Sequence, residues 1–300
     1  MFSFRSRTFS FLTFLTLLTL TTQAQSTDKA LTDSISQIAK EAQGNVGVDI
    51  LDIEANNGVS LQGHQHFPML SVYKFPLALY VLDQVDKGKL SLETPIDIRK
   101  EDWQRMFSPM LNKYPQEHFT LTLREVLAPT VSSSDNVGCD LLFRLVGGPA
   151  KVNKYIHDLD VPAINIVFTE MQMAADWNNQ YQNWSEPAAM EKLLLLFYTG
   201  KLLSPASTKL LLQWMTESTS PKRIHGLMPA GTIVAHKTGT SNTNAAGITA
   251  ATNDVGVVTL ANGHHLIVVL YVSDAKTDQA TREGVMSRIG LAAYDYYSKK

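Results

Sequence analysis

Segments with the pattern of β-strands stand at both ends of this 300-residue chain and enclose a long middle stretch with helical spacing. The predicted strands are 46–53, 58–61, 232–236, 255–260 and 266–272. Turn sequences, Asn56-Asn57-Gly58 and Asn262-Gly263, separate the first two strands and the last two. Strands from both chain ends can share one sheet only if the middle is an insertion between them.

The middle stretch, from about residue 71 to residue 216, is predicted to be mainly helical. Its apolar residues recur at helical intervals, and Thr122 and Glu125 have the spacing of a capping box. Helix-starting prolines are expected at Pro149, Pro187 and Pro205. Further helices are predicted over 27–42 and 277–297, with Ser273 interpreted as the N-cap of the last one.

These patterns predict an α/β fold of the α+β, two-part kind. An antiparallel sheet of about five strands, built from both chain ends and flanked by helices, would carry an inserted all-helical domain. The predicted parts are a signal peptide (1–24), a sheet domain (25–68 plus 217–300) and a helical domain (69–216). A cleft between the two domains is the expected site.

The first 24 residues are typical of a secretory signal peptide. Arg5 and Arg7 precede the apolar run 9–20, and Thr22-Gln23-Ala24 has the small residues of a cleavage site. We therefore expect a periplasmic protein with no membrane segment after cleavage. Loss of the two arginines changes the formal net charge from −2 to −4, which disfavours nucleic-acid binding. Cys139 is the only cysteine, so no intramolecular disulfide can form, and we expect a buried thiol.

A Ser-x-x-Lys pattern occurs three times, as Ser26/Lys29, Ser71/Lys74 and Ser273/Lys276. Such a pattern places both side chains on one face of a helix, where a lysine can activate a serine hydroxyl. A two-letter pattern also arises by chance. Only Ser71 is predicted to begin a long apolar helix in the middle of the chain, so Ser71 is the candidate nucleophile.

Three other stretches carry side chains suited to catalysis. They are Ser132-Ser133-Ser134-Asp135-Asn136, Lys237-Thr238-Gly239-Thr240 and Glu170. Each has an ordinary interpretation by itself, as a helix cap, the end of a strand and a solvated surface carboxylate. Glu170 lies in the stretch 162–184, which is long for a loop without clear periodicity and therefore typical of a functional segment.

Along the chain, the motifs occur in the order Ser-x-x-Lys, Ser-Asp-Asn, Glu and Lys-Thr-Gly. This order resembles that of the class A serine β-lactamases. The resemblance runs from about residue 25 to the C-terminus. It implies that Ser71 attacks a β-lactam carbonyl, with Lys74 or Glu170 as the base for this step, and that Ser134 passes a proton to the leaving nitrogen. Glu170 would activate the water that releases the product.

The resemblance also implies the substrate contacts. Backbone N–H groups of Ser71 and Thr240 would form the oxyanion hole. Asn136 would hold the substrate's side-chain amide, and the Lys237-Thr238-Gly239-Thr240 strand would receive its carboxylate. Arg223 is a candidate second cation for that carboxylate, with an ordinary surface arginine as the alternative. Phe107 is a candidate aromatic at the cleft mouth, or else a core residue. Thr240-Ser241 and these two positions resemble the extended-spectrum branch.

Two positions around Glu170 depart from the family pattern. Ala174 stands where an asparagine commonly shares the hydrolytic water, and Phe168 and Asn183 replace an Arg–Asp pair across the loop neck. The loop must therefore be held in another way, for which packing by aromatic residues is one possibility. The aromatic candidates are Trp177, Tyr181 and Trp184.

Other functions fit the motifs less well. A peptidoglycan D,D-peptidase would not need Glu170, a β-lactam sensor would need a signalling module, and a serine-dependent glutaminase shares fewer motifs. No cofactor is expected, and a monomer is the expected state. The histidine pairs His64/His66 and His264/His265 have no acidic or cysteine partners at metal-ligand intervals, so no metal site is predicted.

Overall fold

The computed structural model describes residues 29–103, 106–114 and 116–300. The predicted signal peptide (1–24) and Ser26 lie outside the described residues. None of the helices in the described part of the chain has the length and hydropathy needed to cross a membrane.

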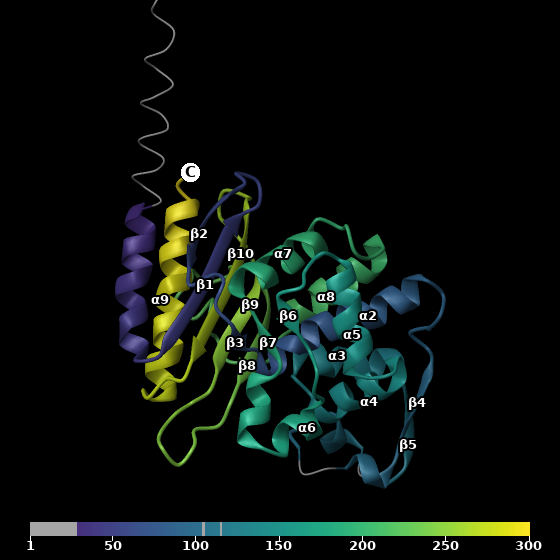
Figure 1. Ribbon diagram of the computed structural model, residues 1–300. Coiled ribbons are helices and arrows are strands. Elements are labelled where there is room, and N and C mark those ends of the chain that lie inside the picture. The colour runs from purple at the N-terminus through teal and green to yellow at the C-terminus, as the bar shows by residue number, and fades with distance from the viewer. Residues whose placement is uncertain (1–28, 104–105, 115) are drawn as a thin grey trace, which may run out of the picture.

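A single antiparallel sheet of five strands takes its strands from both chain ends, as predicted (Figure 1). In spatial order these are β2 (Asn57–Leu61), β1 (Asn45–Asp52), β10 (His265–Ser273), β9 (Thr252–Thr259) and β8 (Val234–Thr240). The hairpins β1–β2 and β9–β10 are those expected from the turn sequences. β1 pairs with β10, which joins the two chain ends.

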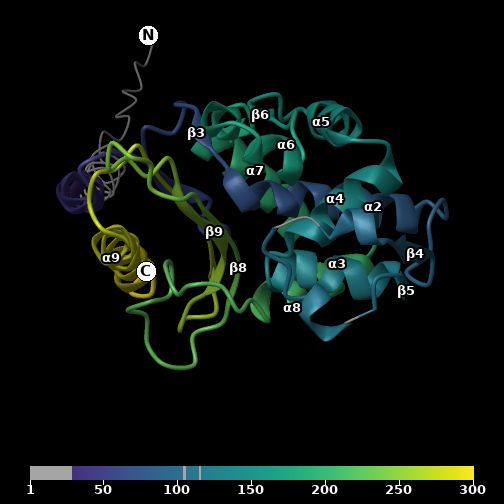
Figure 2. The same cartoon turned by 90° about the horizontal axis from the view of Figure 1, so that it is seen from below.

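Alternate residues of the central strand β10 pack on opposite faces of the sheet, as the two-residue period of a strand requires. Ile267 and Val269 join the core shared with the helical part, whereas Leu266 and Val268 join a second core. The second core lies under α9 (Gln279–Tyr297) and a helix over residues 29–39. Figure 2 shows these two helices on one side of the sheet and the remaining helices on the other.

The part between the two groups of strands is mainly helical. Its α-helices are α2 (Lys74–Asp86), α3 (Leu123–Ser132), α4 (Asn136–Val146), α5 (Pro149–Asp158), α6 (Glu170–Ala174), α7 (Pro187–Tyr198) and α8 (Pro205–Thr216). Its 3-10 helices are η2 (Leu70–Tyr73), η3 (Lys100–Asp102), η4 (Leu111–Lys113) and η5 (Trp177–Tyr181), and η1 (Lys40–Ala42) lies before β1. Two small sheets pair β4 (Pro95–Ile98) with β5 (Phe119–Thr122), and β7 (Trp184–Ser185) with β3 (Phe67–Pro68) and β6 (Ile164–Asn165).

Helix starts follow the local sequence signals. The Thr122 hydroxyl accepts a hydrogen bond from the Glu125 N–H, while the Glu125 carboxylate accepts one from the Thr122 N–H, which completes the capping box. The predicted helix-starting prolines occupy the first turns of α5, α7 and α8. α2 is buried along most of its length, so its first residues lie deep in the molecule.

Two local predictions are wrong. Ser273 is not a helix cap: it is buried at the end of β10, and Asp278 caps α9 instead, because its carboxylate accepts from the Thr281 N–H. Ser71 does not begin an α-helix either. It lies in η2, and α2 begins three residues later at Lys74.

Candidate active site

The turn that carries Ser71 is held by the sheet. The Asn253 side chain on β9 donates to the carbonyl oxygens of Pro68 and Met69, at 2.7 and 3.1 Å. Leu70 adopts a φ of 46°, a left-handed conformation that is uncommon outside glycine. β8 approaches this turn so closely that a Cβ on Gly239 would lie 2.3 Å from the Met69 oxygen. The glycine of the Lys-Thr-Gly motif therefore allows β8 to contact the turn that carries Ser71.

Lys74 is fully buried and links the catalytic candidates. Its Nζ lies 2.9 Å from Ser71 Oγ and 2.9 Å from Glu170 Oε1, and it donates to Asn136 Oδ1 at 2.5 Å. A further bond runs to the Ser134 carbonyl at 3.0 Å. An ammonium buried at this depth needs such partners, because burial of an unpaired charge is costly.

The turn between α3 and α4 presents Ser134 and Asn136 to the cleft. Ser134 adopts a φ of 58°, a second left-handed residue at the site. The neighbouring Asp135 is fully buried and caps α4. Its carboxylate accepts from the Ser108 hydroxyl at 2.8 Å and from the Met110 N–H at 2.8 Å. Asp135 therefore fastens this turn to the segment that carries Phe107.

β8 brings a second buried lysine to the same serine. Lys237 Nζ donates to Ser134 Oγ at 2.9 Å and to the Thr238 carbonyl at 2.9 Å. Burial, and then the charge of Lys74, lower the pKa of Lys237 well below its usual range. An anion bound here would offset that desolvation, so the end of β8 is suited to receive a carboxylate.

Glu170 is only 8% exposed, unlike the solvated surface carboxylate that its sequence context alone would favour. It is the first residue of α6, where the backbone N–H groups of Glu170 and Met171 donate to the Asp140 carboxylate at 2.7 and 3.0 Å. Burial raises the pKa of Asp140 to about 6. Glu170 Oε1 is buried, and its partner among the described residues is the Lys74 ammonium.

The neck of the loop is held by an amide where the family pattern has an ion pair. Asn183 is fully buried, and its Oδ1 accepts from the backbone N–H groups of Val167 and Phe168 at 2.8 and 3.0 Å. Its Nδ2 donates to the Phe168 carbonyl at 2.8 Å. One neutral side chain thus satisfies three backbone groups.

The aromatic residues of the loop have separate positions. Trp184 stacks on His66 with ring centroids 3.5 Å apart, Trp177 lines the cleft, and the Tyr181 hydroxyl donates to Asp274 Oδ1 at 2.6 Å. The anchoring of the loop is therefore polar as well as aromatic.

The candidate residues surround a cleft of about 720 Å³. Its lining includes Ser71, Ser134, Asn136, Glu170, Thr238, Thr240, Ser241 and Phe107. Phe107 is 63% exposed, so the alternative of a core aromatic is excluded. Ala174 lies at the rim, where its methyl group offers no hydrogen bond to a water.

Arg223 is fully buried, which excludes the surface alternative. Its guanidinium donates to the carbonyl oxygens of Gly239 and Asn253 at 2.9 and 2.8 Å, and to Thr240 Oγ1 at 2.8 Å. Glu283 pairs with it at 3.1 Å. Arg223 therefore lies behind β8 and reaches the cleft through the Thr240 hydroxyl.

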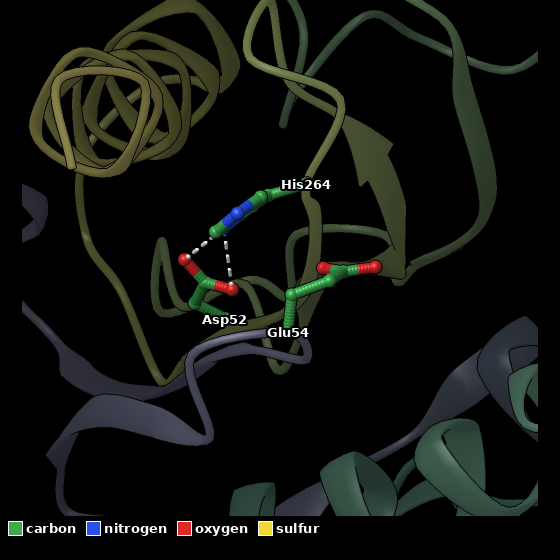
Figure 3. A group of neighbouring side chains, drawn as sticks. All are labelled: Asp52, Glu54 and His264. Atoms are coloured by element: carbon green, nitrogen blue, oxygen red, sulfur yellow. Dashed lines mark hydrogen bonds and ion pairs between the residues drawn. The ribbon is translucent and has the colours of Figure 1, made fainter.

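The histidines predicted to lack acidic partners have them in space. Asp52, Glu54 and His264 place potential metal-ligand atoms within 4.8 Å of one another (Figure 3). The His264 Nδ1 lies 3.0 Å from Asp52 Oδ2, and the two oxygens of Glu54 receive the N–H and the Nδ1 of His265 at 2.7 and 2.8 Å. The carboxylates are thus engaged by the histidines of the β9–β10 turn, and they join that turn to the end of β1. Sequence intervals could not indicate this, because the partners are more than 200 positions apart.

Sequence reasoning missed Asp140 and Asn253 as supports of the site. Asp140 lies four residues after Asn136 on α4, so helical periodicity places both on one face, and that signal was available. Asn253 carried no comparable signal, since its partners are backbone carbonyls 184 and 185 positions away. Cys139 is a buried free thiol, as predicted.

Comparison with known proteins identifies the family. The model of the Beta-lactamase enzyme family matches residues 30–297. Beta-lactamase VEB-1 of Pseudomonas aeruginosa is 42% identical over 90% of this chain and 91% of its own length. Extended-spectrum beta-lactamase PER-1 of the same organism is 40% identical over 93% and 90%.

Solved structures agree with this result. A beta-lactamase from Chitinophaga pinensis is 51% identical, with a TM-score of 0.87 over 89% of this chain and 99% of that chain. The TLA-1 extended spectrum beta-lactamase is 44% identical, with a TM-score of 0.88 over 90% and 99%. This chain therefore belongs to the β-lactamase enzyme family, as a class A serine β-lactamase.

Proposed function

We propose that this protein hydrolyses the β-lactam ring of penicillins and cephalosporins through an acyl-enzyme on Ser71. The observation that carries the proposal is the convergence of Ser71 Oγ and Glu170 Oε1 on one buried ammonium, each 2.9 Å from Lys74 Nζ. The nucleophile and the candidate water-activating carboxylate thus share one charged partner at the edge of the cleft.

In the acylation step, Ser71 Oγ forms a bond to the lactam carbonyl carbon while its proton passes to the Lys74–Glu170 pair. The backbone N–H groups of Ser71 and Thr240 stabilise the oxyanion. When the C–N bond breaks, the nitrogen takes a proton from Ser134, which recovers one from the neighbouring lysines. The contacts of Ser134 Oγ with Lys237 at 2.9 Å and Lys74 at 3.4 Å support this relay.

In the deacylation step, Glu170 removes a proton from a water that attacks the acyl carbon, and Ser71 leaves with the returned proton. This step separates a hydrolase from a D,D-peptidase or a sensor, in which the adduct persists. The burial of Glu170 beside Lys74 supports the hydrolase. The substrate carboxylate would lie at Lys237, Thr238 and Thr240, and its side-chain amide at Asn136.

Steady-state hydrolysis of a chromogenic cephalosporin, combined with intact-mass spectrometry, tests this function. We expect many turnovers by the wild-type protein and no adduct on Ser71→Ala. Glu170→Gln should acylate and then deacylate about 10²–10⁴-fold more slowly, the usual contribution of a general base, so that its adduct accumulates. Arrest of the wild type after one turnover would favour the peptidase or the sensor instead. Glu170→Gln with native turnover would show that another group activates the water.

Two further properties belong to the same proposal. An extended spectrum that includes cephalosporins is supported by relatives whose names carry that description. Export to the periplasm is supported by the signal-like residues 1–24, and we expect the exported protein to be a monomer. The mass of the protein purified from the periplasm should correspond to a chain that begins at Gln25.

A further inference from the structure

The loop that carries Glu170 is tied to the end of β10 by one short side-chain bond. The Tyr181 hydroxyl, at the end of η5, donates to Asp274 Oδ1 at 2.6 Å. Asp274 directly follows β10 and adopts a φ of 54°, a left-handed conformation in which aspartate is tolerated. Burial, and then this hydrogen bond, raise the pKa of Tyr181, so its hydroxyl remains a donor over the working pH range.

Tyr181 is connected to Glu170 by bonds within the loop. The Asn179 side chain in η5 donates to the Gln172 carbonyl in α6 at 2.8 Å. Gln172 closes a capping box with Thr169, the residue before Glu170, through bonds of 2.9 and 3.3 Å. A displacement of η5 would therefore be transmitted to the first turn of α6.

The other anchors of the loop lie on the helical side and at the turn before Ser71. Asp140 holds the start of α6 from α4, and Asn183 closes the loop neck, where its backbone carbonyl also accepts from the Met69 N–H at 2.8 Å. The turn that carries Ser71, in contrast, lies against β8 and β9. A water held by Glu170 must meet an acyl group whose carbonyl is fixed by the β8 edge of the sheet. The Tyr181–Asp274 bond adds a direct link between the loop and the sheet, which helps to align the two reacting groups.

Asp274 is also fixed on the cleft side of the sheet. The next residue, Ala275, exchanges two backbone hydrogen bonds with Thr249, at 2.9 and 3.1 Å. Thr249 belongs to the segment between β8 and β9, whose residues Ser241 and Asn242 line the cleft. The Tyr181–Asp274 bond therefore links the Glu170 loop to the segment between β8 and β9, which lines the opposite side of the cleft.

We propose that Tyr181 and Asp274 are positioning residues that align Glu170 with the acyl-enzyme, and that their bond acts on deacylation rather than on acylation. This role rests on the proposed function, because it presupposes a water activated by Glu170. It names no new catalytic group, since neither side chain contacts Ser71.

Single-turnover and steady-state kinetics of Tyr181→Phe test the role. Loss of the hydroxyl removes the bond and little volume. We expect the acyl-enzyme lifetime to rise about 10-fold, the effect of one hydrogen bond to a charged group. Since deacylation then limits turnover, kcat and KM should fall together while kcat/KM stays within about twofold. Asp274→Ala should reproduce this result, and Asp274→Asn, which keeps an acceptor oxygen, should restore most of the rate.

Tyr155→Phe is the matched control, because the Tyr155 hydroxyl is buried without a hydrogen-bond partner among the described residues. Hydrogen exchange of the peptide that spans 170–181 supplies a readout independent of turnover: it should accelerate in Tyr181→Phe and not in Tyr155→Phe. An equal slowing of acylation and deacylation, or native exchange and native adduct lifetime in Tyr181→Phe, would overturn the proposal. Failure of the proposed function itself would be visible separately, as a wild-type protein that stops after one turnover.

Discussion

At the scale of single residues, Arg223 shows how a buried cation can act at a cleft that it does not line. Its guanidinium donates to Thr240 Oγ1, so the hydroxyl must direct its own proton elsewhere. The cleft is the side on which Thr240 is exposed. With the proposed function, Arg223 would orient a donor toward the expected position of the substrate carboxylate and add a positive charge behind it. The family resemblance suggested the arginine as a cation for this carboxylate but could not indicate the intervening threonine.

Arg223→Ala should raise KM for carboxylate-bearing substrates by about 10-fold or more, the value of a hydrogen bond to a charged group. The substitution also removes the ion pair of Glu283 and the side-chain bonds to two backbone carbonyls, so unfolding by urea must be measured in parallel. Thr240→Ala is the informative partner. If the arginine acts through the hydroxyl, Arg223→Ala should raise KM little further in a protein that already carries Thr240→Ala. An unchanged KM in Arg223→Ala would restrict the arginine to a structural role.

At the scale of elements, the strands and capped helices could be predicted, because each depends on a local pattern. The hairpins followed from Asn-rich turns, and the capping box at Thr122 followed from residue spacing. Ser273 was misplaced because a serine before a helical pattern resembles a cap, whereas here pairing with Asn45 extends β10 as far as this serine. The domain boundaries at 68/69 and 216/217 stay a prediction. Part of the support of the Glu170 loop had no local pattern, since partners such as Asp274 converge on the loop only in the fold.

Asn183→Ala should loosen the loop as a unit. It removes three partly buried hydrogen bonds to the segment 167–168, so we expect a loss of about 1–3 kcal/mol in the free energy of unfolding. Because the neck lies close to Glu170 in the chain, deacylation should slow as well. Urea unfolding and adduct lifetime measure the two effects. Asn165→Ala is the control, because it removes a single, exposed hydrogen bond to the Gln182 carbonyl. It should change neither the free energy of unfolding nor the adduct lifetime by much. A native lifetime in Asn183→Ala would show that Asp140 and Tyr181 suffice to hold the loop.

At the scale of the whole molecule, the helical part and the sheet meet across an apolar core. Two acidic residues, Asp49 and Glu191, lie side by side where α7 covers β1. Asp49 lies on the face of β1 that is covered by α7 and is only 6% exposed. It accepts from the Ser60 hydroxyl at 2.9 Å and is hydrogen-bonded to Glu191 of α7. Burial, and then this neighbouring carboxylate, raise the pKa of Glu191 to about 8. Two carboxyl groups so close can share a proton but cannot both ionise without repulsion.

This pair makes the stability of the protein depend on pH. In the unfolded chain Glu191 titrates near 4.5, so the folded state binds its proton more tightly between about pH 4.5 and 8. The stabilisation is complete below pH 4.5 and is lost as the pH rises toward 8. Glu191→Gln keeps a hydrogen-bond donor toward Asp49 at every pH. We therefore expect it to match the wild type near pH 5 and to exceed its free energy of unfolding by about 2 kcal/mol near pH 8. The full pKa shift would give more, but solvent screens this partly exposed carboxyl and reduces the effect.

Urea unfolding at several pH values between 5 and 8 measures this difference. Glu217→Gln, at an exposed position after α8, controls for the removal of one negative charge and should show no such pH-dependent gain. A difference between Glu191→Gln and the wild type that is constant with pH would mean that Glu191 is ionised in the folded protein. In that case α7 would have to tolerate two adjacent charges against β1, and the substitution would stabilise by relief of repulsion alone. The change with pH of the difference in free energy of unfolding, rather than its size at one pH, therefore decides whether Glu191 is protonated or ionised beside Asp49.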